Sequence, residues 1–489
     1  QRRQFPVFLC FFQVCFILAF SLCAHFNEHA LPDNKSKVYV NTDYPLFQDI
    51  HVMSLVGFGF LMAFLKRYGF AAVSMNLLLC AFVSQWAMLL RGFLSQEFSS
   101  TYSFTISIEE IMIADLSCTP ILISMGALIG RFTPMQFIFM AFIETAVCIG
   151  VEYLVITVMH VNDGGRSLVI HAFGAYFGLA VARTARKVKM ISKRGTIKVV
   201  GEDAFDDNSE DGVDHSELFS MIGTLFLWIF FPSFNAAVQE PEDARIRAVI
   251  NTYLSMTSCT VITFMLTSLT DKQGRFNMIH IQSSTLAGGV AIGSVANAIL
   301  QPWHSLLIGG IAAIISVFGH TQLQPLLRKS PMGVTDTCGV HNLHGLPGIL
   351  SGLCSIVIVA VYDPSYYGDS LYQIYPYFAG GVKNGDRDKW DQAFFQGIAI
   401  LIVFAVAVIS GLITGWILRC GCVNQMSDPT GAHGAEAERA GFYYGLPQDV
   451  LWRSMELGTF HDARELGTAL NLQREMQMRF RDHESNEIF

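Results

Sequence analysis

The chain has 489 residues, of which 52% are hydrophobic and 15% are charged, and its mean hydropathy is +0.41. A soluble protein of this length is not this apolar, so we predict an integral membrane protein. The formal net charge of -8 is spread over loops and the C-terminal segment, so no basic face favours nucleic-acid binding.

Apolar segments of spanning length alternate with polar loops and indicate about twelve transmembrane helices. They lie at 5–23, 50–66, 70–91, 107–130, 134–158, 167–186, 217–235, 246–268, 279–298, 303–325, 340–362 and 392–419. The first segment could instead be a secretory signal peptide, because Arg2 and Arg3 precede it and small residues follow. We favour a retained helix, since its apolar run is longer than the usual signal-peptide core.

The distribution of Lys and Arg between alternate loops predicts the orientation. Most of them, including those of the segment 183–198, fall on the cytosolic side if both termini are cytosolic. This orientation places the acceptor motif Asn34-Lys35-Ser36 in the first external loop, where we predict glycosylation of Asn34. The polar segment 421–489 has no spanning run, and we expect it to be a cytosolic tail.

Two apolar segments share one spacing: Asp163 precedes His171 by eight residues, and Asp336 precedes His344 by eight residues. Eight helical residues rise about 12 Å, which carries each imidazole from the mouth of its segment toward the centre of a hydrocarbon core about 30 Å thick. Ionisable groups at that depth are costly, so we interpret the two histidines as a functional site.

The two motifs fall on the sixth and eleventh predicted helices, which therefore cross the membrane in opposite directions. Matching motifs on oppositely directed helices are typical of an inverted repeat with a site between its halves. We predict an all-α polytopic fold with an inverted five-helix repeat. Its transmembrane domain spans residues 1–420, with repeat halves at about 50–186 and 217–362 and additional helices at 5–23 and 392–419.

Two neutral imidazoles in an apolar lumen offer hydrogen-bond donors and acceptors, which suits a small neutral molecule better than a desolvated cation. A metal site lacks a third ligand, and no nucleophile motif suggests catalysis. His341, one turn before His344, is a secondary candidate, whereas His280 and His320 are interpreted as packing residues. The sequence offers no other charged residue near the midplane that could couple a proton.

At these motifs the sequence resembles the Rh glycoprotein branch of the ammonium transporter superfamily, up to about residue 420. The resemblance is carried by Ile170-His171-Ala-Phe-Gly-Ala-Tyr-Phe-Gly178, Ile222-Gly-Thr-Leu-Phe-Leu-Trp228 with Pro232-Ser-Phe234-Asn235, Thr285-Leu-Ala-Gly-Gly-Val290, Asp336-Thr-Cys-Gly and Asn342-Leu-His-Gly345.

The resemblance implies a homotrimer in which each subunit has its own pore, lined by His171 and His344. It also implies that Asp163 and Asp336 form an acidic pair, which supports the pore and helps to draw ammonium from its mouth. An aspartate at a helix start also caps exposed backbone amides, which is worth about 1 kcal/mol.

A gate of two stacked phenylalanines is a further implication. Phe234 matches one ring, but Leu116 occupies the partner position. We expect a looser gate that stays apolar.

The family's vestibule acids match Glu152 on the external side and Glu217 on the cytosolic side. Asn277 and Arg328 stand where acids are expected. The cytosolic vestibule should therefore attract cations less strongly.

The resulting hypothesis is a passive ammonia and ammonium channel, also open to methylammonium, in the plasma membrane, without a cofactor and without enzymatic activity. Three alternatives stay open. Carbon dioxide permeation needs an apolar pore but no imidazoles, a proton-coupled transporter needs alternating access, and a non-conducting ammonium sensor would act through the tail.

Overall fold

The computed structural model describes residues 4–31, 43–65, 69–130, 132–185, 188–193, 196–201, 214–329, 333–380, 385–420 and 423. The chain divides into two units, residues 1–425 and 426–489. The second unit and Asn34 lie outside the described residues, so the predictions for the tail and for glycosylation stay predictions.

Helices dominate the described residues. The α-helices up to the centre of the chain are α1 (Gln4–Cys23), α2 (Tyr44–Val52), α3 (Phe58–Leu61), α4 (Gly69–Leu94), α5 (Gln96–Thr101), α6 (Ile108–Leu128), α7 (Pro134–Glu152) and α8 (Phe173–Ala185). Those that follow are α9 (Asp214–Ala236), α10 (Glu242–Thr270), α11 (Met278–Ser284), α12 (Ala287–Ile292), α13 (Pro302–Phe318), α14 (Gln324–Lys329), α15 (Leu346–Val361), α16 (Leu371–Ile374) and α17 (Lys389–Ile417).

Short π-helical and 3-10 segments continue several of these helices. They are η1 (Met53–Gly57), η2 (Met62–Phe64), η3 (Tyr153–Val158), η4 (Ser167–Ala172), η6 (Gly293–Val295), η7 (Gly319–Leu323), η8 (His341–Gly345) and η9 (Pro364–Ser370). Wide π turns inside α-helices are often found at functional sites. Both predicted pore histidines lie in such turns, His171 in η4 and His344 in η8.

The polytopic all-α prediction is confirmed. In the described part of the chain, eleven helices are long and apolar enough to cross a membrane. The remaining expected segment, 279–298, differs because it is broken into α11, α12 and η6, with a turn at Thr285 and Leu286. Irregular backbone at membrane depth is tolerated where protein buries it, and residues 281–299 are buried throughout.

Local sequence explains where several long helices begin. Ser107 with Glu110, Thr133 with Gln136, and Asp388 with Asp391 form capping boxes at the starts of α6, α7 and α17. In each box two side chains satisfy backbone amides that the first helical turn leaves without a partner.

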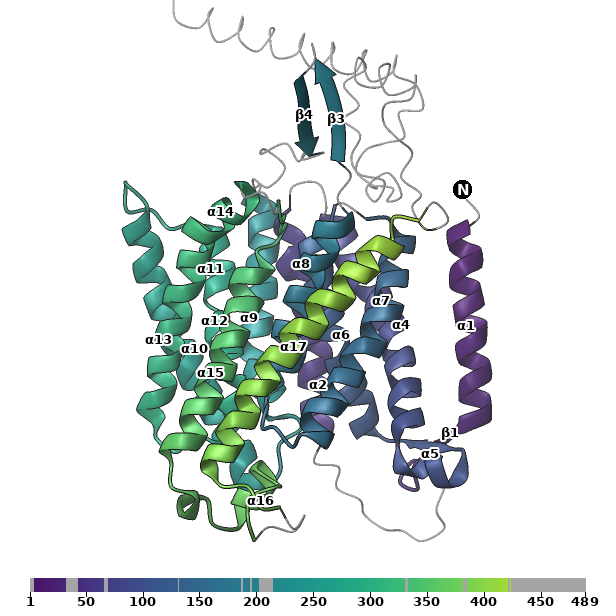
Figure 1. Ribbon diagram of the computed structural model, residues 1–489, viewed down its shortest axis with the longest axis vertical. Helices are drawn as coiled ribbons and strands as arrows, with labels where there is room; N and C mark the ends of the chain where they lie inside the picture. Colours follow the sequence, from purple (N-terminus) through teal and green to yellow (C-terminus); the bar gives the residue numbers. More distant parts are fainter. Residues whose placement is uncertain are drawn as a thin grey trace, which may run out of the picture. The chain divides into compact units, whose positions relative to one another are not determined.

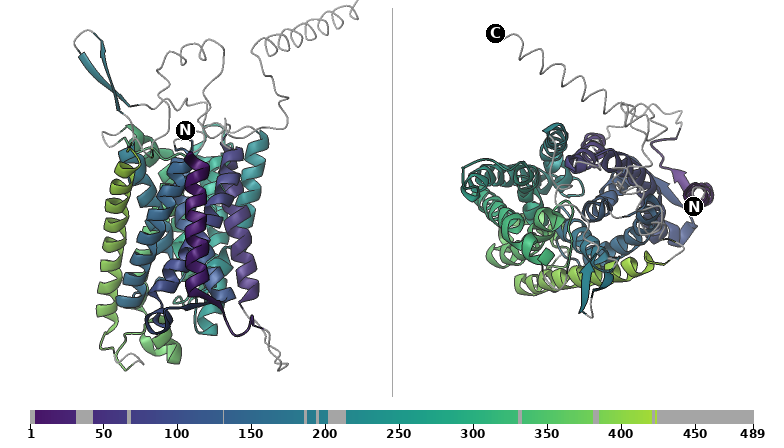
Figure 2. Two further views of the ribbon diagram at one scale, coloured as in Figure 1. Left: turned by 90° about the vertical axis from the view of Figure 1, so that its right-hand side faces the viewer. Right: turned by 90° about the horizontal axis from the view of Figure 1, so that it is seen from above.

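The two motif helices run in opposite directions. α14, which precedes η8, lies at the end of the bundle where α8 finishes, and α16, which follows α15, lies at the opposite end (Figure 1). We call these the α14 end and the α16 end. α17 packs against α8 of the first half and α15 of the second, whereas α1 lies at the edge of the bundle against α4 and α7 (Figure 2).

Two short strand pairs complete the described structure. β1 (Ala24–Phe26) pairs in parallel with β2 (Phe104–Ile106), and β3 (Val188–Lys193) pairs antiparallel with β4 (Thr196–Gly201).

Candidate functional site

The structure brings the two repeat histidines into direct contact. The Nδ1 atoms of His171 and His344 lie 3.1 Å apart. Their rings are stacked, with centroids 5.1 Å apart and an angle of 1° between the planes. Both side chains are buried, so the pair lies inside the protein and not on its surface.

This contact determines the hydrogen positions in a neutral pair. One Nδ1 donates and the other accepts, so the two imidazoles hold opposite tautomers. One Nε2 therefore carries a hydrogen and the other carries a lone pair. The Nε2 of His171 is buried and has no hydrogen-bond partner. The pair can thus offer one donor and one acceptor to a small molecule.

Each histidine turn is capped by its aspartate. Asp163 Oδ2 accepts hydrogen bonds of 3.0 Å from the backbone amides of Leu168 and Val169. Asp336 accepts hydrogen bonds of 2.9 Å from the amides of Val340 and His341. Both aspartates thus hold the helix starts from which the histidines project, and their carboxylates are engaged by backbone donors.

Asp163 has a further contact that crosses between the halves. The hydroxyl of Ser294, in η6, donates to its Oδ1 at 2.5 Å. Burial raises the pKa of the Asp163 carboxyl, although this hydrogen bond and the backbone amides act in the opposite direction. Nearby, the Gly165 amide donates to the Gly293 carbonyl at 2.7 Å. The broken segment therefore supports the loop before η4.

Aromatic rings enclose the imidazole pair. Phe231 and Phe234, both on α9, lie with ring centroids 5.8 and 5.5 Å from that of His171. Phe58, on α3, stacks on His344 at 6.1 Å. These rings keep the surroundings of the pair apolar, and Phe234, the predicted gate residue, lies next to His171.

Two cavities approach this centre. The first, which we call the phenylalanine cavity, has a volume of about 20 Å³ and reaches His344. It is lined by Phe58, Leu61, Met62, Phe64, Leu122, Ile123, Gly126, Gln282, Ser283, Cys338, Val340, Leu343 and His344.

The second, which we call the arginine cavity, has a volume of about 60 Å³. Leu116 lines it together with Ile170, the residue before His171. The two predicted gate positions, Leu116 and Phe234, are both buried. The leucine keeps this predicted gate position apolar, and the ring nearest to Phe234 on its own helix is Phe231, with centroids 5.8 Å apart.

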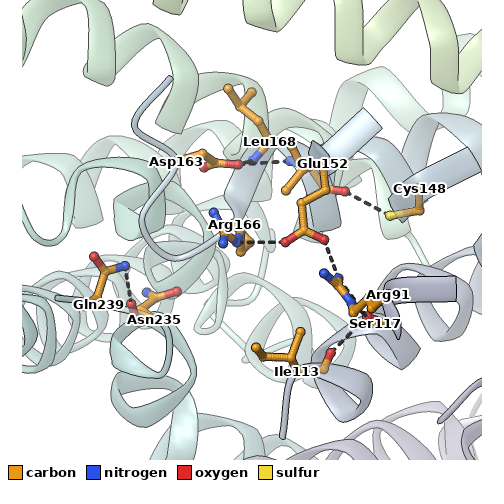
Figure 3. A network of polar contacts seen from close by, with 11 residues as sticks. Arg91, Ile113, Ser117, Cys148, Glu152, Asp163, Arg166, Leu168, Asn235 and Gln239 are labelled. Carbon is orange, nitrogen blue, oxygen red and sulfur yellow. Dashed lines mark hydrogen bonds and ion pairs between the residues drawn. The ribbon is translucent and has the colours of Figure 1, made fainter. Parts of the chain in front are cut away.

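Glu152, predicted as a vestibule acid, lies in the wall of the arginine cavity between two guanidinium groups (Figure 3). Arg91 pairs with its Oε2, and Arg166 Nε lies 3.2 Å from its Oε1. Both carboxylate oxygens are thus engaged by cations. Neither arginine was singled out from the sequence, because the three residues lie on separate elements and no local pattern links them.

The other predicted residues lie apart from the imidazole pair. Glu217 is half-buried near the start of α9, where its carbonyl accepts from Gln282. Asn277 caps α11 through the amides of Ile279 and His280. Arg328 belongs to α14.

His341, the secondary candidate, begins η8 and packs edge-on against Tyr176 with ring centroids 5.7 Å apart. Its Nδ1 is buried and has no hydrogen-bond partner. His341 therefore packs against α8, the helix that continues η4 beyond His171.

The expectation that no charged residue besides the histidines lies near the midplane is wrong. Glu144 is fully buried near the middle of the span Pro134–Val158. Its Oε1 lies 2.5 Å from the hydroxyl of Ser124, which also lies 2.8 Å from the carbonyl of Gly174. The sequence signal was a single carboxylate inside an apolar run.

Within the described ranges, no group of three or more His, Cys, Asp or Glu side chains is arranged so that it could hold a metal ion. The site is instead a hydrogen-bonded imidazole pair inside a bundle of spanning helices. Fold and site together define a multi-pass membrane protein of the transporter and channel class. The chain belongs to the Ammonium Transporter Family, because the model of that family matches residues 9–438. Its similarity to ammonium transporters of the Rh type assigns it to the Rh branch. This is a family of transporters and not of enzymes.

Individual relatives agree with this assignment. The chain is 37% identical to the ammonium transporter Rh type B of Oryzias latipes over 441 residues, which cover 88% of this chain and 91% of that protein. It is 40% identical to the ammonium transporter Rh type A of Mus musculus over 448 residues, or 88% and 92% of the two chains. The solved structure of Nitrosomonas europaea Rh50 matches 89% of this chain and 97% of its own, with 28% identity and a TM-score of 0.63.

Proposed function

We propose that this protein is a passive channel that conducts ammonia as the neutral molecule past the pair of His171 and His344. The observation that carries the proposal is the Nδ1 to Nδ1 contact of 3.1 Å inside an apolar enclosure. The family and its Rh-type ammonium transporters support ammonium and ammonia as the substrate.

The chemistry favours a neutral permeant. Moving an ammonium-sized ion into a low-dielectric interior costs of order 20 kcal/mol in the idealised case, although relaxation lowers this penalty. A neutral ammonia both donates and accepts hydrogen bonds, so it matches one imidazole lone pair and one imidazole N–H. Ammonium would therefore release its proton before it passes Phe234 and Leu116. Methylammonium would follow the same path.

The remaining roles belong to the same proposal. Asp163 and Asp336 hold the histidine turns, and Glu217 contributes negative charge on the cytosolic side. The protein would form a homotrimer in the plasma membrane with both termini cytosolic, as the Lys-rich and Arg-rich loops favour. The α16 end then faces outward.

The test is stopped-flow measurement of internal pH in liposomes that contain the purified protein, under an ammonium gradient. We expect fast alkalinisation that His171→Ala and His344→Ala abolish. His25→Ala is the matched control, because His25 lies exposed in β1 and should conduct like the unmodified chain. Unchanged ammonia flux in folded His171→Ala and His344→Ala proteins would refute the role of the pair.

A carbon dioxide gradient tests the first alternative, which is carbon dioxide permeation. If the same pore conducts carbon dioxide, the histidine variants should leave that flux nearly unchanged, since the apolar path needs no imidazole. A charge movement coupled to each transported molecule would instead support the proton-coupled transporter. Removal of residues 421–489 should leave a channel conducting and would silence a sensor.

A further inference from the structure

The arginine cavity carries more positive than negative charge. Arg91 from α4, Glu152 from α7 and Arg166 from the loop before η4 meet in its wall (Figure 3). Their side chains are only 27%, 13% and 18% exposed, respectively. Two guanidinium groups share one carboxylate, so a positive charge is left over in a confined space.

The neighbouring carboxylate does not cancel this charge by contact. Asp163 directs Oδ2 to the amides of Leu168 and Val169 and Oδ1 to the hydroxyl of Ser294. It is absent from the lining of the cavity, whose described residues include Glu152 as the single acid. Asp163 still interacts electrostatically with Arg166 across a short distance, but its oxygens are engaged elsewhere and leave the guanidinium N–H groups free of a second carboxylate contact.

Hydrogen-bond donors remain available there. Arg91 uses Nε and Nη2 on the Ser117 hydroxyl and Nη2 on Glu152, and Arg166 uses Nε on Glu152. Among the described residues, the Nη1 group of Arg91 and both Nη groups of Arg166 have no hydrogen-bond partner. The hydroxyls of Ser117 and Thr145 donate to helix carbonyls, so guanidinium N–H groups are the donors that an occupant would meet.

Arg166 also adopts a backbone conformation that is costly for its residue type. Its φ of 60° and ψ of 29° lie in the left-handed region, which favours glycine. Strained residues cluster at binding sites, where surrounding contacts hold them in place. Here the ion pair with Glu152 holds the guanidinium at the cavity.

We propose that the arginine cavity is a binding site for a small monovalent anion, with chloride and bicarbonate as the two candidates. A volume of about 60 Å³ admits a few water molecules or such an anion and excludes nucleotides and larger organic acids. Guanidinium groups bind anions through charge-assisted hydrogen bonds.

The anion gives the cavity a role in transport, and this part rests on the proposed function. Leu116, one of the two gate positions, lines the same cavity. An unoccupied cavity repels ammonium through its net positive charge, whereas an occupied one is neutral. The bound anion therefore restores cation access that Glu152, already paired twice, does not provide.

The binding test uses purified full-length protein and does not depend on transport. The melting temperature is measured against increasing chloride, bicarbonate or gluconate at constant pH and ionic strength. We expect chloride, bicarbonate or both to raise it saturably and the larger gluconate not to. Separate measurements with chloride and with bicarbonate show which of the two anions binds.

Three variants locate the effect. Arg166→Gly, which suits the left-handed backbone, should raise the half-saturating anion concentration at least about tenfold. Glu152→Gln should lower it, because a negative charge is lost. Arg245→Gln is the control, because Arg245 lies outside the cavity and pairs with Asp43 at 3.7 Å. It should leave the half-saturating anion concentration unchanged.

Equal stabilisation by gluconate, or an unchanged half-saturating concentration in Arg166→Gly, would overturn the anion site and leave only a structural ion-pair triad. If Arg166→Gly does not fold, Arg166→Gln decides the same question. Ammonia flux in liposomes with external chloride replaced by gluconate then tests the link to transport. Saturable anion binding without any ammonia flux would refute the proposed function and leave the anion site standing.

Discussion

At the scale of single residues, the site depends on where each hydrogen lies. Because the two Nδ1 atoms of His171 and His344 share one hydrogen, the neutral pair offers one acceptor and one donor. Glu144 presents the same question. The Ser124 hydroxyl has one hydrogen but two acceptors within reach, at 2.5 and 2.8 Å. A protonated Glu144 that donates through Oε1 to Ser124, which in turn donates to Gly174, gives each of these contacts one donor and one acceptor, while Oε2 of Glu144 is buried without a partner.

This arrangement predicts that Glu144→Gln keeps its folding and its ammonia flux, because the amide N–H can replace the carboxyl O–H toward Ser124. Glu144→Ala should lower the free energy of unfolding by about 1 to 3 kcal/mol, since it opens a cavity and leaves a buried hydroxyl with a poorer partner. Chemical denaturation in detergent with parallel liposome flux measures both. A Glu144→Gln protein that folds normally but no longer conducts would show instead that this carboxyl must ionise during transport.

At the scale of elements, α2 links the two helices that carry the predicted gate. Asp49 accepts a hydrogen bond of 2.6 Å from Ser233, which precedes Phe234 on α9. Two residues further along α2, the Nδ1 of His51 lies 2.8 Å from Oδ2 of Asp115, which precedes Leu116 on α6. One short helix thus fixes the backbone beside both gate positions.

We predict that His51→Ala lowers the free energy of unfolding by about 1 to 3 kcal/mol, because it leaves the buried Asp115 carboxylate without its partner. It should also raise methylammonium flux relative to ammonia flux, since α6 is less restrained beside Leu116. The double variant His51→Ala with Asp115→Asn should recover most of the stability, because a neutral amide costs less to bury without a partner than a carboxylate does. Equal stability of the single and double variants would argue against a stabilising role of this hydrogen bond.

At the scale of the whole molecule, the repeated Asp-to-His motif could be read from the sequence. Single contacts between distant elements could not. The two Asp-to-His spacings, together with the positions of their segments as the sixth and eleventh predicted helices, were enough to predict opposed helices and the pairing of His171 with His344. Hydropathy averages over a window, so it did not reveal the break at Thr285. Arg91 and Arg166 reach Glu152 from two other elements, and their contact requires the folded chain.

The interface between the halves is the last feature that can be tested directly. Gly348, near the start of α15 in the second half, faces η4 of the first half. A Cβ atom at this position would lie 2.9 Å from the Ser167 carbonyl oxygen and 3.0 Å from both the amide nitrogen and the Cβ of Ala172. Ala172 follows His171, so any shift that relieves this crowding also moves one imidazole relative to the other.

We therefore predict that Gly348→Ala destabilises the protein by about 1 to 3 kcal/mol, as overpacking of a close contact does, and reduces ammonia flux. The matched control is Gly150→Ala in α7, where an added Cβ meets nothing within 4 Å. That substitution should be neutral or slightly stabilising, because alanine favours helix more than glycine does. Melting temperature and liposome flux are measured for both variants. If Gly348→Ala behaves like Gly150→Ala, the halves can separate at this contact without disturbing the imidazole pair. A loss of flux that exceeds the loss of folded protein would instead show that the close approach of the halves sets the geometry of the pore.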